Sequence, residues 1–174
     1  MAIDSATIWP FQISTTAMSR ITETLALLAI TAWVGALWAV GYLAVPVLFY
    51  SQPDRQLAGM LAGVMFSRVA WLGLACGGYL LAYWLFTAGA AVWRQTGFRL
   101  VTAMLLLTLV AHFGLQPMMN DLKLQALPLE VMKSPLAHQF GLLHGISSIL
   151  YLLQGLLGAA LVIYARSRTF TRRG

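Results

Sequence analysis

Four long apolar stretches, separated by short polar breaks, dominate the 174-residue chain; they cover about 21–49, 69–92, 98–119 and 140–164. Each reaches the roughly 20 residues that a helix needs to cross a hydrocarbon core about 30 Å thick. Lipid offers no hydrogen-bond partner to a backbone N–H or C=O group, and the alternating ten-residue segments of a membrane barrel are absent. The pattern therefore predicts an all-α integral membrane four-helix bundle, arranged as two helical hairpins.

Composition supports this class and leaves little sequence for a separate soluble domain. The chain is 60% hydrophobic and only 9% charged, and its mean hydropathy is +0.78, which is unusual for a water-soluble domain of this size. We expect a polar N-terminal arm over 1–19, one four-helix transmembrane domain over 20–166, and a basic cytoplasmic tail over 167–174.

The net charge of +6 follows the ends of the predicted helices. Seven cations precede the first helix, occupy the second loop or lie in the tail, against three in the other two loops. The seven are Arg20, Arg94, Arg99, Arg166, Arg168, Arg172 and Arg173; the three are Arg55, Lys123 and Lys133. Because cytoplasmic loops of membrane proteins carry the excess of Lys and Arg, this predicts both termini in the cytoplasm and the loops 50–56 and 120–137 outside. No nucleic-acid partner is needed to explain the high pI.

Small residues at four-residue spacing predict close helix packing in two of the helices. The second helix is expected to begin before Arg68, with Asp54 as its N-cap after Pro53. Small-xxx-small rows of this kind let backbones approach closely. The predicted packing positions are Gly59, Gly63, Ser67, Gly73, Gly77, Gly141 and Gly145.

Polar side chains within the spans gather in the predicted outer half of the bilayer. His112 and Gln116 lie four residues apart and so share a helix face, and His144 and Ser148 do the same on the last helix. Such groups are costly in lipid unless they are paired, which marks them as candidates for a site. The candidate polar site comprises Arg68, His112, Gln116, His144, Ser147 and Ser148.

Each member also has a structural interpretation. Arg68 can extend to the outer headgroups, because 69–92 is already long enough to span. His112 and His144 can be neutral and hydrogen-bonded to a carbonyl, a serine or a glutamine. If Arg68 and the two histidines instead converge, they can hold a water, a lipid phosphate or a metal, for which His112 and His144 are the candidate ligands.

Several short motifs resemble the transmembrane protein 205-like domain. They are Trp33-Val34-Gly35, Ala44-Val45-Pro46-Val47-Leu48-Phe49, Ala58-Gly59 with Phe66, Gln116-Pro117-Met118-Met119 and Phe140-Gly141-Leu142-Leu143-His144-Gly145-Ile146-Ser147. The resemblance covers about 24–164 and implies a bacterial four-helix protein of the inner (cytoplasmic) membrane with no assigned function. It also implies a more distant likeness to copper-resistance D membrane domains. The residues Met118-Met119 replace the aromatic or arginine that often follows the proline, and no catalytic residue is carried over.

Three function classes are compared. We favour a non-enzymatic multi-pass membrane protein, either an accessory subunit or a helix bundle that handles a small solute or lipid, with the bilayer, another membrane protein or a second copy as partner. The alternative is a copper or haem b carrier, since imidazoles and thioethers suit Cu(I) or an axial haem ligand; methionine packing explains the same residues without a cofactor. An intramembrane enzyme is disfavoured, because no carboxylate interrupts the second to fourth helices.

Overall fold

The computed structural model describes residues 15–171, and every regular element within that range is helical. The first hairpin consists of α1 (Thr15–Trp38), the π-helical segment η1 (Ala39–Ala44), α2 (Val45–Ser51) and α3 (Arg55–Ala88). A 3-10 turn, η2 (Gly89–Arg94), leads to the second hairpin. That hairpin consists of α4 (Thr96–Leu109), the π-helical segment η3 (Val110–Leu115), α5 (Gln116–Ala126), the short turn η4 (Val131–Lys133) and α6 (Ala137–Thr171).

Four continuous helical segments in the described range are long and apolar enough to cross a membrane: Arg20–Ser51, Arg55–Ala88, Thr96–Ala126 and Ala137–Ser167. The first and third each combine two α-helices with the π-helical segment between them, because the backbone stays in the right-handed helical region throughout. The prediction of an all-α protein with four membrane-spanning helices is therefore confirmed.

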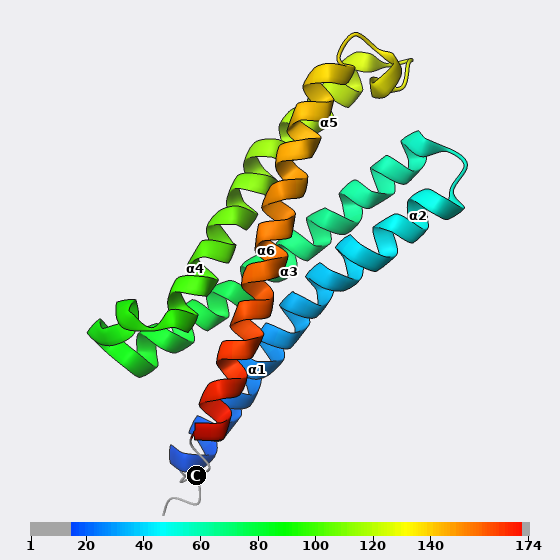
Figure 1. The fold of residues 1–174 in the computed structure, drawn as a ribbon. Coiled ribbons are helices and arrows are strands. Elements are labelled where there is room, and N and C mark those ends of the chain that lie inside the picture. Colours follow the sequence, from blue (N-terminus) through cyan, green and yellow to red (C-terminus); the bar gives the residue numbers. More distant parts are fainter. Residues whose placement is uncertain (1–14, 172–174) are drawn as a thin grey trace, which may run out of the picture.

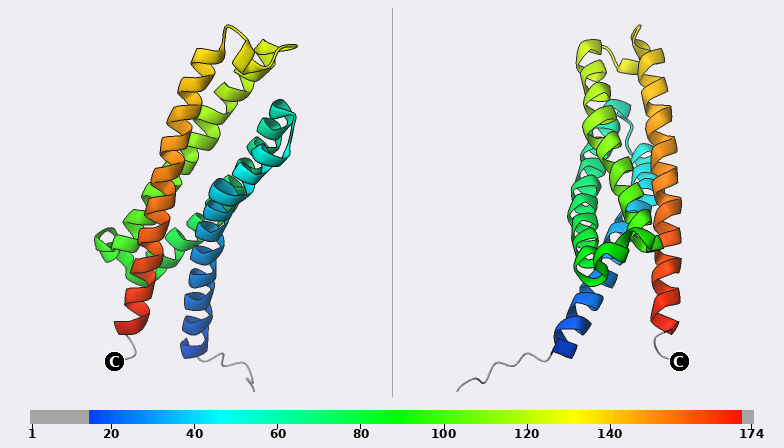
Figure 2. Two further views of the ribbon diagram at one scale, coloured as in Figure 1. Left: turned by 45° about the vertical axis from the view of Figure 1, so that its right-hand side comes forward. Right: turned by 90° about the vertical axis from the view of Figure 1, so that its left-hand side faces the viewer.

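The four spans pack in a closed ring, in which α1 contacts α3 and α6, and α4 contacts the same two helices. Figure 1 shows the start of α1 and the end of α6 at one end of the bundle, the same end toward which η2 lies. We call this the terminal end, and we call the opposite end, with the connections at 52–54 and 127–136, the loop end. Figures 1 and 2 show the two hairpins leaning apart toward the loop end.

Several boundaries differ from those expected. Helix α1 already begins at Thr15, inside the predicted arm 1–19, of which 1–14 lie outside the described residues. Helix α6 continues to Thr171, so the predicted tail 167–174 begins as helix, and 172–174 lie outside the description. The stretch 120–126 is helical rather than loop, because it is rich in good helix formers and meets no breaker before Pro128.

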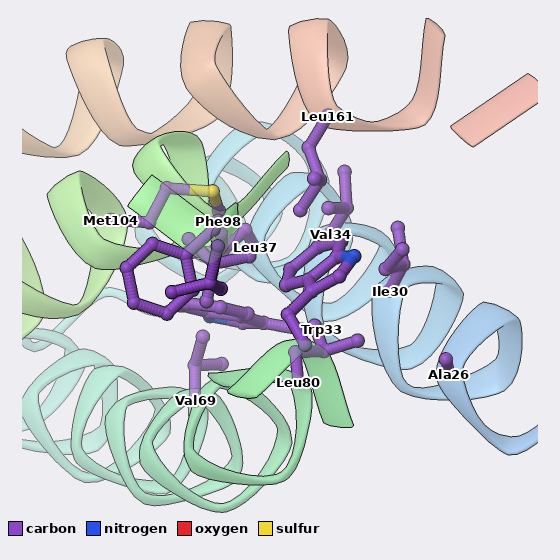
Figure 3. Close-up of a cluster of buried hydrophobic side chains, with 13 residues drawn as sticks. Ala26, Ile30, Trp33, Val34, Leu37, Val69, Leu80, Phe98, Met104 and Leu161 are labelled. Carbon is purple, nitrogen blue, oxygen red and sulfur yellow. The ribbon is translucent and has the colours of Figure 1, made fainter. Parts of the chain in front are cut away.

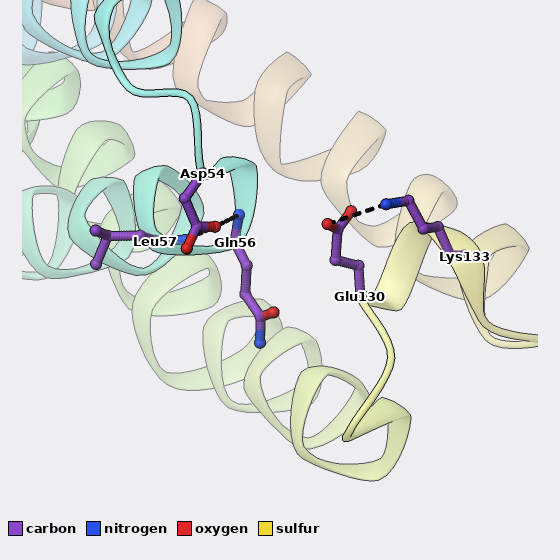
Figure 4. A network of polar contacts seen from close by, with 5 residues as sticks. All are labelled: Asp54, Gln56, Leu57, Glu130 and Lys133. Atoms are coloured by element: carbon purple, nitrogen blue, oxygen red, sulfur yellow. Dashed lines mark hydrogen bonds and ion pairs between the residues drawn. The ribbon is translucent and has the colours of Figure 1, made fainter.

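Helix α3 begins and ends at residues that fit those positions. Asp54 has an extended backbone and its side chain accepts hydrogen bonds from the N–H groups of Gln56 and Leu57 at 2.9 and 3.0 Å (Figure 4). The predicted N-cap and the early start of this helix are thus confirmed. At the other end Gly89 adopts φ +52°, a left-handed conformation that suits glycine and stops the helix four residues before the predicted limit. The Glu130–Lys133 ion pair, also in Figure 4, lies exposed at the loop end.

The apolar core occupies the terminal half and the centre of the bundle. Trp33 of α1, Leu80 of α3, Val101 and Met104 of α4 and Leu161 of α6 are fully buried there (Figure 3). Lipid tails are as apolar as these side chains, so burial alone does not drive helices together in a membrane. Close van der Waals packing and hydrogen bonds between helices hold the ring.

The loop-end half has much less packed volume. Among the described residues, η1, α2 and η3 contain no buried side chain. The buried apolar residues toward this end are small, namely Ala58, Ala62 and Ala126. The hairpins are therefore joined firmly at the terminal half and centre and only sparsely toward the loops.

Each π-helical segment ends two residues before a proline, and the proline explains it. Pro46 and Pro117 have no N–H to offer the carbonyls of Tyr42 and Phe113, and in an α-helix their rings would crowd those carbonyls. The wider turn relieves the crowding: Val45 donates to the carbonyl of Val40, and Gln116 to that of Ala111, each five residues back. Each hairpin thus carries the same π-helix and proline combination in its first helix.

The six glycines that were predicted to pack against other helices separate into two groups. A Cβ atom at Gly73 would overlap the indole of Trp33, and one at Gly77 would overlap Leu105, so both allow close helix contact. At Gly59, Gly63, Gly141 and Gly145, which were also predicted to pack, a Cβ would meet nothing within 4 Å in the described part of the chain. The buried loop-end face of α3 is instead one residue earlier, at Ala58 and Ala62, and Ser67 is half-buried.

Candidate functional site

A polar relay joins the two hairpins at η3. The ring atom Nδ1 of His112 lies 2.6 Å from Oε1 of Gln116, one helical turn further on. The amide Nε2 of Gln116 in turn donates to the backbone carbonyl of Gly63 on α3 at 3.0 Å. Both side chains are half-buried, and the wide turn of η3 presents them toward α3. We call these three groups the His112 relay.

Aromatic rings surround the imidazole of the relay. Trp71 of α3 meets His112 edge-to-face at 5.5 Å between ring centroids, and Phe113 does so at 4.7 Å. Trp71 and Phe113 also contact each other at 6.0 Å and an interplanar angle of 90°. Each of these two side chains is 55% exposed, so their outer faces point toward the surroundings of the bundle. The relay lies within Thr96–Ala126, a segment long and apolar enough to cross a membrane.

The last turn of α1, directly before the other π-helical segment, forms a corresponding contact on the opposite side of the ring of helices. The hydroxyl of Tyr151 on α6 donates to the carbonyl of Leu37 at 2.6 Å, and Trp38 Nε1 donates to the carbonyl of Gly155 at 3.2 Å. Gly41 within η1 leaves room for the Tyr151 ring. Each π-helical segment therefore meets the second helix of the other hairpin: η1 meets α6, and η3 meets α3.

A buried polar pair ties the second hairpin together near the centre. Gln154 of α6 donates from Nε2 to Oγ1 of Thr108 at 2.6 Å, and Thr108 donates to the carbonyl of Met104 at 2.9 Å. Both side chains are almost fully buried. The donor and acceptor are both satisfied, so this pair is a structural hydrogen bond between α4 and α6.

The structure joins only part of the predicted polar site. His112 and Gln116 come together as their spacing indicates. His144 is exposed and stacks on Phe140 of its own helix at 6.0 Å and 11°, while Ser148 donates to the His144 carbonyl, also within α6. Ser147 is half-buried. Among residues 15–171, no hydrogen bond or ring contact connects Arg68 or His144 to the relay, and Arg68 is exposed.

Arg68 and His144, which were expected to converge with His112, are therefore not joined to it by this network. The expectation was based on the similar predicted depth of the three residues in the membrane. Contact also depends on the direction in which each helix face points. His144 instead belongs to a column at the loop end, in which Lys123 Nζ lies 5.7 Å from the centroid of the Phe140 ring on which His144 stacks.

Four contributors to the seams between helices were not predicted: Trp38, Trp71, Tyr151 and Gln154. Gln154 carried a usable signal, because an amide within an apolar span needs a partner. Pro46 and Pro117 carried another, since a proline inside a helix predicts a local distortion. The aromatic residues carried none, because the same residue types serve equally well at the membrane interface.

Among the described residues, the candidate metal ligands His112 and His144 do not belong to a cluster of His, Cys, Asp or Glu side chains. Within the described residues, no set of three or more His, Cys, Asp or Glu side chains lies close enough to hold a metal ion. The single cysteine, Cys76, is a free thiol on α3.

The four spanning helices and the contacts between the two hairpins define a multi-pass, all-helical membrane protein with two related hairpins. Residues 28–128 match the family described as a domain of unknown function, DUF4149. This match covers more than half of the 174 residues, so the chain belongs to that family. The matched region includes both π-helical segments and the His112 relay. No curated protein and no solved structure matches the chain.

Proposed function

We propose that this protein is a non-enzymatic membrane protein that holds a small molecule dissolved in the bilayer at the His112 relay. The observation that supports this most is a connected polar group inside a spanning helix, flanked by aromatic rings that remain half exposed. A purely structural hydrogen bond is normally enclosed, as the Gln154–Thr108 pair is. π-Helical segments also occur frequently at functional sites.

The site suits binding better than catalysis. The relay consists of one imidazole, one amide and one backbone carbonyl, and it contains no hydroxyl, thiol or carboxylate side chain. Such groups orient a ligand by hydrogen bonds while the rings provide apolar contact.

Both termini are proposed to face the cytoplasm of a bacterial inner membrane, on the strength of the seven-to-three distribution of cations. The loop end is then the outer end. Within the proposal, the resemblance to the transmembrane protein 205-like domain supports a bacterial membrane protein and adds no ligand.

An accessory role is the second candidate, and the sparse loop-end half favours it. Helices that lean apart and bury mainly alanines leave lateral surface on which a partner helix can pack. The copper or haem b alternative has weaker support, because the second candidate ligand, His144, stacks on Phe140 of its own helix and makes no hydrogen bond or ring contact with the His112 relay among the described residues.

Native mass spectrometry of the protein in lipid nanodiscs tests these candidates. We expect a bound small molecule with wild-type protein, loss of that molecule in His112→Phe, and retention in His144→Phe, a matched change of an exposed histidine. Wild-type protein without a bound molecule contradicts the proposal. Co-purification of one defined membrane protein would then support the accessory role, and a Soret band or stoichiometric copper would support the carrier.

A further inference from the structure

The hydrogen bonds of the relay fix where the proton of His112 resides. The carbonyl of Gly63 can only accept, so the nitrogen of the Gln116 amide must face it. The amide oxygen therefore faces the imidazole, and a contact of 2.6 Å between that oxygen and Nδ1 requires a proton on Nδ1.

The second ring nitrogen of His112, Nε2, then carries a lone pair and can accept a hydrogen bond. A neutral imidazole carries one proton, and a charged imidazolium is costly within a membrane span. Over residues 15–171, no hydrogen bond reaches Nε2. An acceptor without a partner in an apolar environment is unfavourable, so a donor that arrives through the lipid gains by pairing with it.

The surroundings of Nε2 indicate what kind of donor fits. Trp71 and Phe113 each meet the imidazole edge-to-face and are 55% exposed, so they offer ring faces to a planar apolar group. The site lies within Thr96–Ala126, a segment able to span the bilayer, so the ligand must dissolve in lipid.

We propose that His112 accepts a hydrogen bond at Nε2 from the hydroxyl of a membrane-soluble aromatic alcohol of the quinol class, whose ring packs on Trp71 and Phe113. This inference rests on the proposed function and names the ligand class of the same site. The corresponding quinone binds less well, because its carbonyl oxygen also carries only lone pairs toward Nε2. Gln116 acts as a positioning residue, since it keeps the proton on the far side of the ring.

The tautomer can be measured without any ligand by NMR of protein labelled with 15N-histidine in nanodiscs. The chain has three histidines, so His112→Phe assigns the signal of His112. We expect a protonated Nδ1 and an unprotonated Nε2 for this residue, and in Gln116→Leu we expect the proton to redistribute toward Nε2. A proton on Nε2 in the wild-type protein would overturn the inference.

Binding measurements then compare a short-chain benzoquinol, kept reduced, with the matching benzoquinone, using phosphatidylcholine nanodiscs. One ordinary hydrogen bond corresponds to a preference of about tenfold for the quinol. We expect that ratio in the wild-type protein and in His144→Phe, and a ratio near one in His112→Phe and Gln116→Leu.

The possible failures are distinguishable. Equal binding of quinol and quinone by wild-type protein overturns the proposed ligand class, while a different small molecule that depends on His112 would leave the proposed function intact. Wild-type protein that binds neither probe and retains no other small molecule overturns both. Gln116→Leu keeps the imidazole of His112 and removes only the amide that bonds the Gly63 carbonyl, so the test does not depend on one variant folding.

Discussion

At the scale of single residues, glycine positions decide how closely these helices approach. Trp33 is fully buried, and its indole lies where a side chain at position 73 would start. The Trp33 N–H has no hydrogen-bond acceptor within the described residues, so shape alone holds the ring there. Within a membrane, where burial gives little driving force between helices, such contact is a main source of stability.

Replacing Gly73 by Leu is expected to lower the free energy of unfolding by about 2 kcal/mol or more, because the new Cβ would lie within 2.9 Å of Trp33 Cε2 and the buried ring has no room to move. Gly59→Leu is the matched control on the same helix, where a Cβ meets nothing within 4 Å of the described chain, and should change stability by less than about 0.5 kcal/mol. Thermal unfolding in mild detergent measures both. Equal losses would show that the packing at Gly73 is not special.

At the scale of elements, the two π-helical segments set the directions of side chains at the seams. An α-helix and a π-helix advance the chain by different angles, so a wide turn rotates everything beyond it. In α4 to α5 this rotation places Gln116 against Gly63, and in α1 to α2 the wide turn sets Gly41 against the ring of Tyr151. The proline of each hairpin therefore influences where other side chains of its helix point.

Pro117→Ala should close the π-helical segment η3 into a regular α-helix. The restored N–H can pair with the carbonyl of Phe113, and loss of the wide turn rotates α5 by up to about 100°, the angle per residue of an α-helix. Gln116 then leaves Gly63. Spin labels at Met60 and Leu124, both exposed, report the change as a shifted distance distribution in electron spin resonance.

Pro53→Ala is the control for this measurement, because Pro53 lies in the connection between α2 and α3, outside the helices. It should leave the distribution unchanged. An unaltered distribution in Pro117→Ala would mean that neighbouring helices, and not the proline, impose the wide turn.

At the scale of the whole molecule, the two hairpins are related by more than their order in the chain. Each first helix carries a π-helical segment before a proline. Each of these segments contacts the second helix of the other hairpin, η1 through Tyr42 with Tyr151 and η3 through His112 with Trp71. Both hairpins run in the same direction between the terminal end and the loop end (Figure 1). This arrangement is that of a parallel repeat about an axis along the membrane normal.

The orientation of the bundle in the membrane gives a direct prediction. Because the terminal end carries most of the cations, a reporter fused after Gly174 should be active only as a cytoplasmic fusion, such as green fluorescent protein, and inactive as alkaline phosphatase. A fusion placed in the connection at 127–136 should behave in the opposite way. Reversed results would place the loop end in the cytoplasm and leave the fold unaffected.

The sequence was sufficient for the class of fold and for two local features. Apolar runs of spanning length must become helices in lipid, whatever their neighbours. The Asp54 cap and the four-residue spacing of His112 and Gln116 are likewise local, because their partners lie within one turn. These features depend on backbone geometry alone and could be predicted without the rest of the molecule.

Only the tertiary structure decided which polar groups meet across helices. The sequence predicts a similar depth for His144, Arg68 and His112, yet the rotation of each helix leaves the first two outside the relay. The carbonyl of Gly63 completes the relay, and Trp71 and Phe113 surround it. Helix rotation depends on close contacts such as that of Trp33 with Gly73 and on the turns imposed by Pro46 and Pro117. Hydropathy determines that a segment crosses the membrane, but packing determines which face it presents, and the proposed site depends on that face.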